Sequence, residues 1–342
     1  MRIAAVIVNF RTADATAQAV ISLDRELRDS ALRKRFSNYV IVVVDNDSND
    51  GSFESLRETF SEPKWADRVV VIASGHNGGF GHGVNVGVRY VIDAFGAPTY
   101  IYVLNPDATV GAGAVETLVG FMEAHPDAGL VGNVIRNVSA DVIKAFRFPS
   151  VLGELEGSAS LGLLTRLLRK HMMVLDPGGT TEVDWVSGVS MLFRGDVFST
   201  AGFFDEGFFL YFEEIDFARR VREAGWKVYF NADVEVGHIG ALSTGMRDET
   251  RRMPRYWFES RRRYLVKHHG RLYAAACDAA WLAGHAVFKI KLAMKRAPKP
   301  ARPSVGRDFL RYAAANVLKP APEAVQNRQP EPAPLRPALA AR

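Results

Sequence analysis

The tripeptide Asn105-Pro106-Asp107 has the residue types and the position that point most directly to chemistry in this sequence. It follows the apolar run Tyr100–Leu104, whose length and flanking turn residues predict a buried strand. In α/β proteins, groups just outside the carboxyl end of a strand face the ligand crevice. A carboxylate and an amide there offer the hard oxygen ligands that a divalent cation needs while it contacts phosphates.

Three acidic residues, Glu213, Glu214 and Asp216, open the helix that the pattern predicts over Phe212–Ala224. Acidic side chains in a first turn often do no more than complement the helix dipole. The aromatic-rich run 208–212 just before them would nevertheless raise a carboxyl pKa toward the range that suits a general base. We expect one of the three to act as a base and the others to pair with arginines one turn further along the helix.

His238, between Gly237 and Gly240, is a candidate further ligand for a cation bound at Asp107. A single histidine is also often a packed structural residue, and the sequence leaves both interpretations open. The downstream turn Ser243-Thr244-Gly245 is a candidate phosphate-binding turn, which favours the ligand interpretation.

Two polar residues at the ends of predicted strands indicate a nucleotide site. Asp45 directly follows the run Val40–Val44, and Asn9 follows the first apolar run of the chain. The Asp45 carboxylate can accept a hydrogen bond from the imide N–H of uracil or thymine, or from a ribose hydroxyl. A structural turn also accounts for much of this segment, because Asp, Asn, Ser and Gly are ordinary turn and cap residues. We expect Asn9 to line the same cleft as Asp45.

The glycine-rich segment 75–83 lies between a predicted strand and a predicted helix. Such turns let backbone N–H groups approach a phosphate at a helix N-terminus, although a plain flexible turn has the same composition. Asn77 and Asn85 would supply directional side chains to the cleft. The first strand is not followed by a Gly-x-Gly-x-x-Gly pattern, which disfavours nicotinamide binding.

A regular sheet must position these residues, and the first half of the chain alternates strand and helix patterns. Runs rich in β-branched residues predict strands at Ile3–Val8, Val40–Val44, Val69–Ala73 and Tyr100–Leu104. Helix patterns lie at Asp14–Leu27, Ser52–Phe60, Gly79–Phe95 and Ala112–Glu123. This alternation indicates βαβ units, an α/β fold and a largely parallel sheet. With 342 residues, 48% of them hydrophobic, the chain can bury a sizeable core.

The pattern loosens after Gly129. Strands are predicted at Leu130–Val134, Trp185–Phe193 and Trp226–Asn231, whereas the stretch Val151–Val174 has no clear period. From Glu249 to about Lys295 the pattern is helical, with a break near His269-Gly270. Residues 297–342 are rich in proline and are expected to be flexible, with a turn of amphipathic helix within Arg307–Leu318.

Charge is distributed unevenly along the chain. Residues 1–249 contain 23 Lys and Arg against 33 Asp and Glu, whereas residues 250–342 contain 20 against 5. A basic end behind an acidic body suggests an anionic partner, either a membrane or a nucleic acid. The best candidate for a membrane span, Leu272–Phe288, has only 17 residues and contains Asp278, short of the roughly 20 apolar residues required. Because Cys277 is the single cysteine and the chain opens without a secretory pattern, we expect a cytoplasmic protein.

Together these segments resemble the family 2 glycosyltransferases, which have a GT-A fold, and most of all their bacterial rhamnosyltransferase branch. The resemblance covers about residues 1–270 in family order and rests on Val8-Asn9-Phe10, Val44-Asp45-Asn46, Asn77-Gly78-Gly79-Phe80-Gly81, Asn105-Pro106-Asp107, Trp185-Val186-Ser187-Gly188, Phe203-Phe204-Asp205-Glu206, Phe212-Glu213-Glu214-Ile215-Asp216, Gly225-Trp226 and His238. It implies a GT-A catalytic domain over residues 1–248, divided near residue 110 into a nucleotide-sugar half and an acceptor half. Basic amphipathic helices over 249–296 and the tail over 297–342 would follow.

The resemblance also implies the residues that hold the donor and a metal ion. The nucleotide sugar would be bound by Asn9, Asp45, Asn46, Asn77, Gly78, Asn85, Asn105 and Asp107. Asp107 stands at the last aspartate of the Asp-x-Asp metal motif and, with His238, would bind Mn²⁺ or Mg²⁺. Asn105 replaces the first aspartate of that motif and would reach the ribose, or the metal through water.

For catalysis, the resemblance aligns Glu214 with the aspartate that serves the family as the base. The longer side chain of Glu214 keeps Asp216 as the alternative base. Trp185, Asp205 and Glu213 would shape the acceptor side, although Trp185 is as readily a core residue.

The implied reaction is inverting transfer of a sugar from a nucleoside diphosphate to a hydroxyl of a glycan or lipid-linked oligosaccharide, in the synthesis of a cell-surface polysaccharide. A divalent cation would stabilise the charge of the departing diphosphate, and a carboxylate would take the acceptor proton. The expected donor is dTDP-rhamnose, with UDP-galactofuranose or another UDP-hexose as the alternative.

The basic end has two interpretations. Eight Lys and Arg in Arg251–Arg271, interleaved with aromatic residues and followed by the apolar stretch Leu272–Met294, suit an anionic membrane leaflet. The same helices would otherwise pack on the catalytic domain with their charges in water. We expect peripheral association with the inner face of the cytoplasmic membrane, no nucleic-acid partner, and leave the oligomeric state open.

Three rival functions are also considered. A nucleotidyltransferase needs a basic loop near the first strand, where this chain has only Arg11. A non-catalytic nucleic-acid-binding protein would explain the basic end but not the acidic, glycine-rich first half. The third possibility is a carbohydrate-binding relative that no longer catalyses transfer, and the sequence leaves it open.

Overall fold

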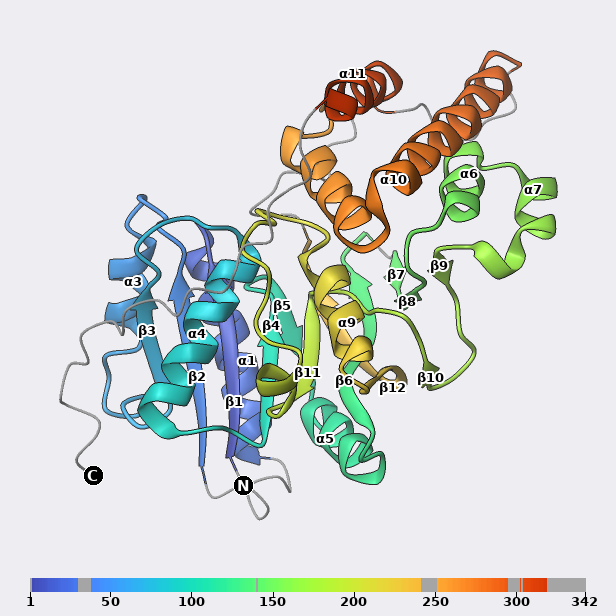
Figure 1. Cartoon of the computed structure of the whole chain (residues 1–342). Helices are drawn as coiled ribbons and strands as arrows, with labels where there is room; N and C mark the ends of the chain where they lie inside the picture. Colours follow the sequence, from blue (N-terminus) through green and yellow to red (C-terminus); the bar gives the residue numbers. More distant parts are fainter. Residues whose placement is uncertain are drawn as a thin grey trace.

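The computed structural model describes residues 2–29, 38–139, 141–240, 251–294, 302 and 304–318, so the turn Ser243-Thr244-Gly245 lies outside the described residues. Four parallel strands form one half of a central sheet, in the order β3 (Val69–Ala73), β2 (Asn38–Asp45), β1 (Arg2–Asn9) and β4 (Tyr100–Leu104). Their β-branched runs are largely buried because helices cover both faces of the sheet. The predicted α/β class with a largely parallel sheet is confirmed (Figure 1).

The order of these strands creates a ligand crevice. From β1 the chain adds β2 and β3 on one side, and then returns to place β4 on the other side of β1. Such a reversal leaves an opening outside the carboxyl ends of the two central strands, where ligands of open α/β sheets bind. Asn9 and Asn105 therefore stand at the ends of β1 and β4 beside this opening.

The second half of the sheet is mixed. Strand β11 (Ser190–Arg194) runs antiparallel between β4 and β6 (Ala128–Asn137), and β12 (Lys227–His238) lies parallel to β6. Both β6 and β12 extend further than predicted, because the register of β12 on β6 shifts between Asn231 and Glu235 and pairing then resumes. The predicted strand at Trp185–Phe193 begins only at Ser190. The short strands are β5 (Ala108–Val110), β7 (Val142–Ile143), β8 (Ala145–Phe146), β9 (Val174–Leu175) and β10 (Thr181–Glu182).

Helices cover the two faces of this sheet and bury two apolar clusters. One face packs against α1 (Ala13–Asp29), α3 (Ser52–Thr59) and α5 (Ala114–Ala124). The other face packs against α4 (Phe80–Phe95), the short α8 (Val197–Thr200) and α9 (Glu213–Glu223). Apart from α8, which was not predicted, these helices lie within a few residues of the predicted ones, because apolar spacing marks the buried face of each.

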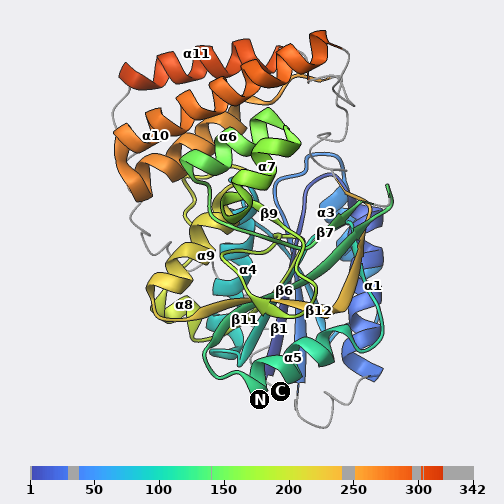
Figure 2. The same ribbon diagram turned by 90° about the vertical axis from the view of Figure 1, so that its right-hand side faces the viewer.

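The remaining helices gather at one end of the molecule, beyond the sheet (Figures 1 and 2). They are α6 (Val151–Ala159), α7 (Gly162–Leu167), the single-turn η1 (Arg169–His171), α10 (Arg255–Ala293) and α11 (Val305–Leu318). The predicted break is present, since Gly270 has non-helical angles (φ 81°, ψ 173°) and divides α10 into two arms. Phe309 of α11 stacks on Trp281 of α10, so the proline-rich tail contains a packed helix as well.

Among the described residues, we find no helix with both the length and the apolar content required to cross a bilayer.

Candidate active site

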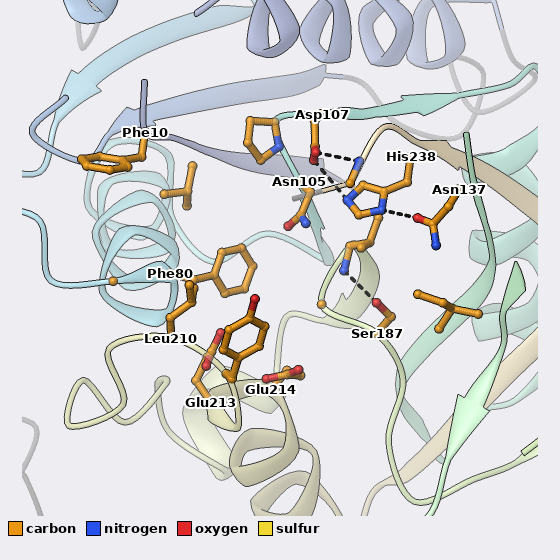
Figure 3. Close-up of a pocket in the computed structure, with 18 of the residues that line it drawn as sticks. Phe10, Phe80, Asn105, Asp107, Asn137, Ser187, Leu210, Glu213, Glu214 and His238 are labelled. Atoms are coloured by element: carbon orange, nitrogen blue, oxygen red, sulfur yellow. Dashed lines mark hydrogen bonds and ion pairs between the residues drawn. The ribbon is translucent and has the colours of Figure 1, made fainter. Parts of the chain in front are cut away.

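A cavity of about 960 Å³ opens at the carboxyl ends of the central strands (Figure 3). Its walls come from the ends of β1, β2, β4 and β12, the loop before α4, and the first turn of α9. Seven predicted site residues line it: Asn46, Asn77, Asn105, Asp107, Glu213, Glu214 and His238. In Figure 3 Asp107 and His238 stand on one side of the cavity, and Glu213 and Glu214 on another. We call the wall with Asp107 and His238, which could bind a cation, the cation-type wall. The wall with Glu213 and Glu214 is the carboxyl-type wall.

The cation-type wall is built by Asp107, His238 and Asn137. The Nε2 atom of His238 lies 3.1 Å from Oδ1 of Asp107, and Nδ1 of His238 lies 2.8 Å from Oδ1 of Asn137. The other Asp107 oxygen accepts a hydrogen bond from the Gly240 N–H at 2.9 Å. Burial alone would raise the pKa of Asp107, but the hydrogen bond and charge of His238 outweigh it and hold the pKa below its usual range.

This arrangement fits a divalent cation. In the tautomer in which Nδ1 of His238 donates to Asn137 Oδ1, the Nε2 atom presents a lone pair. That lone pair faces a carboxylate oxygen of Asp107, so the two atoms can bind one divalent cation together. A hydrogen bond from the far nitrogen is the usual way in which a protein orients a metal-binding histidine. Within the described ranges, three or more His, Cys, Asp and Glu side chains nowhere converge as a metal-binding group.

The carboxyl-type wall begins where α9 begins. Tyr211 and Phe212 both adopt left-handed backbone angles (φ 66° and 69°), which are costly for residues other than glycine and turn the chain sharply into the helix. One buried oxygen of Glu213 and one of Glu214 has no hydrogen-bond partner among the described residues. Burial raises the pKa of Glu214 to about 7. Burial, and then the charge of Glu214, raise the pKa of Glu213 as well, so the two adjacent carboxyls titrate as a coupled pair.

Asp216, the alternative base, has a different environment. Its fully buried carboxylate binds Arg220 at 2.9 Å, Lys267 at 2.6 Å and His268 at 2.7 Å. Burial alone would raise the pKa of Asp216, but His268, Arg220 and Lys267 outweigh it and hold the pKa well below the usual range. A permanently ionised carboxylate that faces α10 cannot accept an acceptor proton efficiently. Asp216 instead ties the helix that carries Glu214 to the first arm of α10.

This tie predicts a large stability effect for Asp216→Asn. The variant removes the buried negative charge that Arg220, Lys267 and His268 share, and breaking a buried ion pair typically costs about 3–5 kcal/mol in the free energy of unfolding. Because the folded-state pKa is depressed, the contribution of Asp216 is complete above about pH 4 and is lost as the pH falls. Urea denaturation at pH 7 and at pH 3 checks both points, since the gap between wild type and variant should narrow in acid.

The matched control is Glu223→Gln on the same helix, where an exposed i,i+4 pair with Arg219 is removed. That change should alter stability by less than about 1 kcal/mol. Equal urea midpoints for wild type and Asp216→Asn would show that the network does not stabilise the fold.

The loop before α4 forms the third wall. The amide nitrogen of Asn46 donates to Asn77 Oδ1 and to the Gly79 carbonyl, both at 3.0 Å, so its oxygen must point elsewhere. That buried oxygen has no partner among the described residues and is suited to an N–H or O–H of a ligand. A Cβ atom at Gly79 would lie 1.7 Å from the Phe209 carbonyl oxygen, so glycine is required for this loop to touch the loop before α9. A Cβ atom at Gly78 would lie 2.5 Å from the His82 ring, so Gly78 is also closely packed.

Asn9, Asp45 and Asn85 lie deeper than expected. Asn9 is fully buried and donates to Asp45 at 2.6 Å, and Asp45 also accepts two hydrogen bonds from Ser48. These two residues thus brace the loop that presents Asn46. Asn85 is fully buried on α4, where its amide binds the Phe204 backbone and Glu206, away from the cavity.

The structure places Asp205 and Trp185 away from the cavity as well. Asp205 is buried in ion pairs with Arg263 and Lys267 of α10, at 2.9 and 2.8 Å. Trp185 stacks on Phe146, with ring centroids 4.0 Å apart, and donates through Nε1 to the Arg147 carbonyl. Trp185 and Asp205 were expected to shape the acceptor side, but in the structure both make internal contacts.

The sequence interpretation missed Asn137, Phe10 and Phe80 as lining residues. Asn137 is the last residue of β6 and pairs with His238 of β12. The predicted strand ended at Val134, so the polar residue at the true strand end was not recognised as a site residue. Phe10 and Phe80 were part of recognised motifs, but an aromatic residue after a strand looks like core packing until the cavity is known.

Solved structures establish the fold class. The mannosyltransferase PcManGT from Pyrobaculum calidifontis, in complex with GDP-Man and Mn²⁺, aligns with a TM-score of 0.53 at 16% identity, over 93% of this chain and 80% of that one. GalNAc-T7 with UDP, GalNAc and Mn²⁺ aligns with a TM-score of 0.56 at 14% identity, over 94% of this chain and 58% of that one. The chain therefore has the GT-A fold of glycosyltransferases.

Sequence comparison then gives the family. The model described as glycosyl transferase family 2 matches residues 25–166, and the model described as glycosyl transferase family group 2 matches residues 100–298, more than half of the chain. The chain belongs to the family 2 group of glycosyltransferases, so the predicted family and enzyme class are confirmed.

Among the relatives are two rhamnosyltransferases. The N-acetylglucosaminyl-diphospho-decaprenol L-rhamnosyltransferase of Mycobacterium tuberculosis is 29% identical over 219 residues, covering 60% of this chain and 68% of the relative. Rhamnosyltransferase WbbL of Escherichia coli K12 is 30% identical over 156 residues, covering 44% and 57%. The hexosyltransferase Agl10 of Haloferax volcanii, named for low-salt glycan biosynthesis, is 28% identical over 232 residues, covering 66% of each chain. The rhamnosyltransferase-like character expected from the sequence is thereby confirmed.

Proposed function

We propose that this chain is an inverting, metal-dependent rhamnosyltransferase that moves L-rhamnose from dTDP-rhamnose to a hydroxyl of a lipid-linked glycan. The acceptor would be a precursor of a cell-surface polysaccharide, met at the inner face of the cytoplasmic membrane. The named activities of the Mycobacterium tuberculosis and Escherichia coli relatives support the donor, and the first of them supports the lipid-linked acceptor. The observation that carries the proposal is the cavity with a cation-type wall and a carboxyl of raised pKa facing one space.

Donor binding is assigned to the loops at the ends of β1, β2 and β4. The unpaired oxygen of Asn46 accepts the imide N–H of thymine or uracil, or a ribose hydroxyl, while Asn77 holds the Asn46 amide in the required orientation. The Phe10 ring at the mouth of the cavity offers an apolar face to the base. Asn105 lies between this region and Asp107, in reach of the ribose or the diphosphate.

Asp107 and His238 would hold Mn²⁺ or Mg²⁺, whose hard oxygen preference suits it to contact the diphosphate of the donor. When bound, the ion stabilises the negative charge of the departing diphosphate as a Lewis acid. Asn137 orients His238 for this task. The Mn²⁺ in the two solved GT-A structures supports a divalent ion in a site of this fold.

Glu214 is assigned as the general base. Its carboxylate takes the proton of the acceptor hydroxyl as that oxygen attacks the anomeric carbon from the face opposite the diphosphate, which inverts the configuration. A pKa of about 7 suits this role, because the group is ionised in half of the molecules at neutral pH and still binds a proton well. Burial raises the pKa of Glu213, and in its protonated form this carboxyl can donate a hydrogen bond to the acceptor.

A screen of nucleotide sugars tests this proposal. Purified protein with Mn²⁺ and a lipid-linked N-acetylglucosamine diphosphate acceptor should release dTDP from dTDP-rhamnose faster than UDP from any UDP-hexose. The anomeric configuration of the product, read by NMR, should be inverted. If a UDP-hexose is preferred, the proposed donor is wrong but the proposed mechanism stands. Transfer of a hexose would agree with the name of the Haloferax volcanii relative, a hexosyltransferase. No turnover with any donor, with or without the ion, would refute the transferase.

A further inference from the structure

The second arm of α10 carries an exposed apolar stripe. The solvent-exposed positions Leu272, Ala276, Ala279, Ala283, Ala286 and Ile290 recur every three or four residues, so they lie along one face of the helix. Leu272 is 89% exposed and Ile290 is 59% exposed, although both are large and apolar. Over residues 271–293 the stripe is about 35 Å long. The opposite face, with Cys277 and Gly284, packs against α6 and the rest of the helical end.

The short helix α7 carries exposed apolar residues of its own. Leu163 and Leu167 lie one turn apart and are 66% and 72% exposed. Lys291, near the end of α10, donates a hydrogen bond to the Ser160 carbonyl, just before α7. The end of α10 therefore lies close to the start of α7, in agreement with the position of both helices at one end of the molecule (Figure 2).

The exposed charged residues of α7, η1 and the end of α10 are basic, and the next acidic residue after η1, the exposed Asp176, pairs with Lys144. Arg166, Arg169, Lys170 and Lys289 are exposed beside the apolar residues of these elements. Residues 157–175 and 279–294 contain no Asp or Glu. Asp278, the acidic residue of the second arm, is bound inside by Arg261. An apolar helix face flanked only by basic side chains is the chemistry of helices that lie in an anionic membrane surface.

We propose that the stripe of α10 and the adjacent α7, together named the docking face, seat this protein on an anionic phospholipid bilayer. The apolar side chains enter the headgroup boundary, and the flanking basic side chains bind the lipid phosphates. A second copy of the chain is a poorer occupant, because a two-fold interface would bring the basic flanks of both copies together. The inference rests on the proposed function only in that a lipid-linked acceptor makes this location useful.

The docking face differs from the basic segment that the sequence suggested. Arg261, Arg263 and Lys267 are all in ion pairs with acidic residues of the body or of α10 itself. Arg252 likewise pairs with Asp308 of α11. Arg263 and Lys267 hold α10 to the catalytic body, whereas Arg252 and Arg261 hold the helices of the helical end together. We therefore assign the membrane contact to the second arm and α7.

Vesicle sedimentation tests the docking face. The full chain, without donor or acceptor, is mixed with vesicles of phosphatidylcholine alone or with phosphatidylglycerol added, at low and high salt. We expect binding to the anionic vesicles that weakens with salt. The triple variant Arg169→Ala/Lys170→Ala/Lys289→Ala should bind about a hundredfold more weakly, at about fivefold per charge. The variant Ala286→Asp/Ile290→Asp should abolish binding, because it places charge within the stripe.

The charge-matched control is Arg25→Ala/Arg57→Ala/Lys64→Ala, which removes three exposed basic residues from the α1 and α3 side of the molecule. It should bind vesicles as the wild type does. Equal binding by the control and the docking-face triple variant would overturn the proposal, as would a dimer that Ala286→Asp/Ile290→Asp dissociates without any vesicle binding. Thermal stabilisation by dTDP with Mn²⁺ is measured on every variant and should be unchanged. If the protein binds vesicles but not the nucleotide, the proposed transferase function is refuted and the docking face stands. If it binds the nucleotide but not vesicles, only the docking face is refuted.

Discussion

Replacing Glu214 by Gln should lower kcat by about 10²–10⁴-fold, the usual contribution of a general base. Gln keeps the size of the side chain and removes the proton acceptor, so stabilisation by dTDP and Mn²⁺ should persist and KM for the donor should change little. The wild-type kcat should rise about tenfold per pH unit below about pH 7 and level off above it, because the base acts when it is ionised and its pKa is about 7. Steady-state kinetics across pH 5.5–9 measure both effects.

The matched control is Glu213→Gln, one residue away in the same wall. If Glu213 is protonated at neutral pH, an amide replaces a neutral acid and kcat should fall far less than in Glu214→Gln. A Glu214→Gln enzyme with the wild-type rate, or one that keeps the wild-type pH profile, would remove Glu214 from the mechanism.

Replacing Asp107 by Asn should lower kcat/KM by about 10³-fold, equivalent to roughly 4 kcal/mol of lost charge stabilisation. The Asn oxygen can still accept the Gly240 N–H, so the loop after β12 keeps its contact. What is lost is the negative charge opposite His238, and with it the dependence of dTDP binding on Mn²⁺. Isothermal titration of dTDP with and without Mn²⁺ should show that dependence in the wild type and not in the variant.

A graded companion is Asn137→Ala, which leaves both proposed ligands in place and frees His238 to rotate. Loss of such an orienting partner typically weakens metal affinity by about 10–100-fold. Wild-type Mn²⁺ dependence in both Asp107→Asn and Asn137→Ala would place the ion elsewhere.

The sheet was predictable because its strands carry their own signal. The runs Val40–Val44 and Tyr100–Leu104 are apolar throughout, as strands buried on both faces must be, and their burial is nearly complete. The ligand crevice followed from the alternation of strands and helices, since polar residues at strand ends meet at one edge. The end of β12 was missed because the shifted register near Asn231 resembles a turn in the sequence.

The site was predictable where a residue acts through its position on one element, and not where distant segments determine its partners. Asp107 and Glu214 follow directly from a strand end and a helix start. Asp205 and Asp216 resemble them locally, but cations of α10, some 50 residues further along the chain, neutralise both. Asn85 likewise finds its partners more than 100 residues away. No local pattern contains such pairings.

Gly270 is the point at which α10 turns from its first arm to its second arm. The first arm of α10 is bound through Lys267 to the helix of Glu214, and the second arm carries the docking face. In the proposed seating on a bilayer, these two braced arms would set the height of the cavity above the bilayer. A glycan anchored in that bilayer can then present a hydroxyl to Glu214 only if its own length matches this height, so the enzyme would gauge how far its acceptor has already been extended.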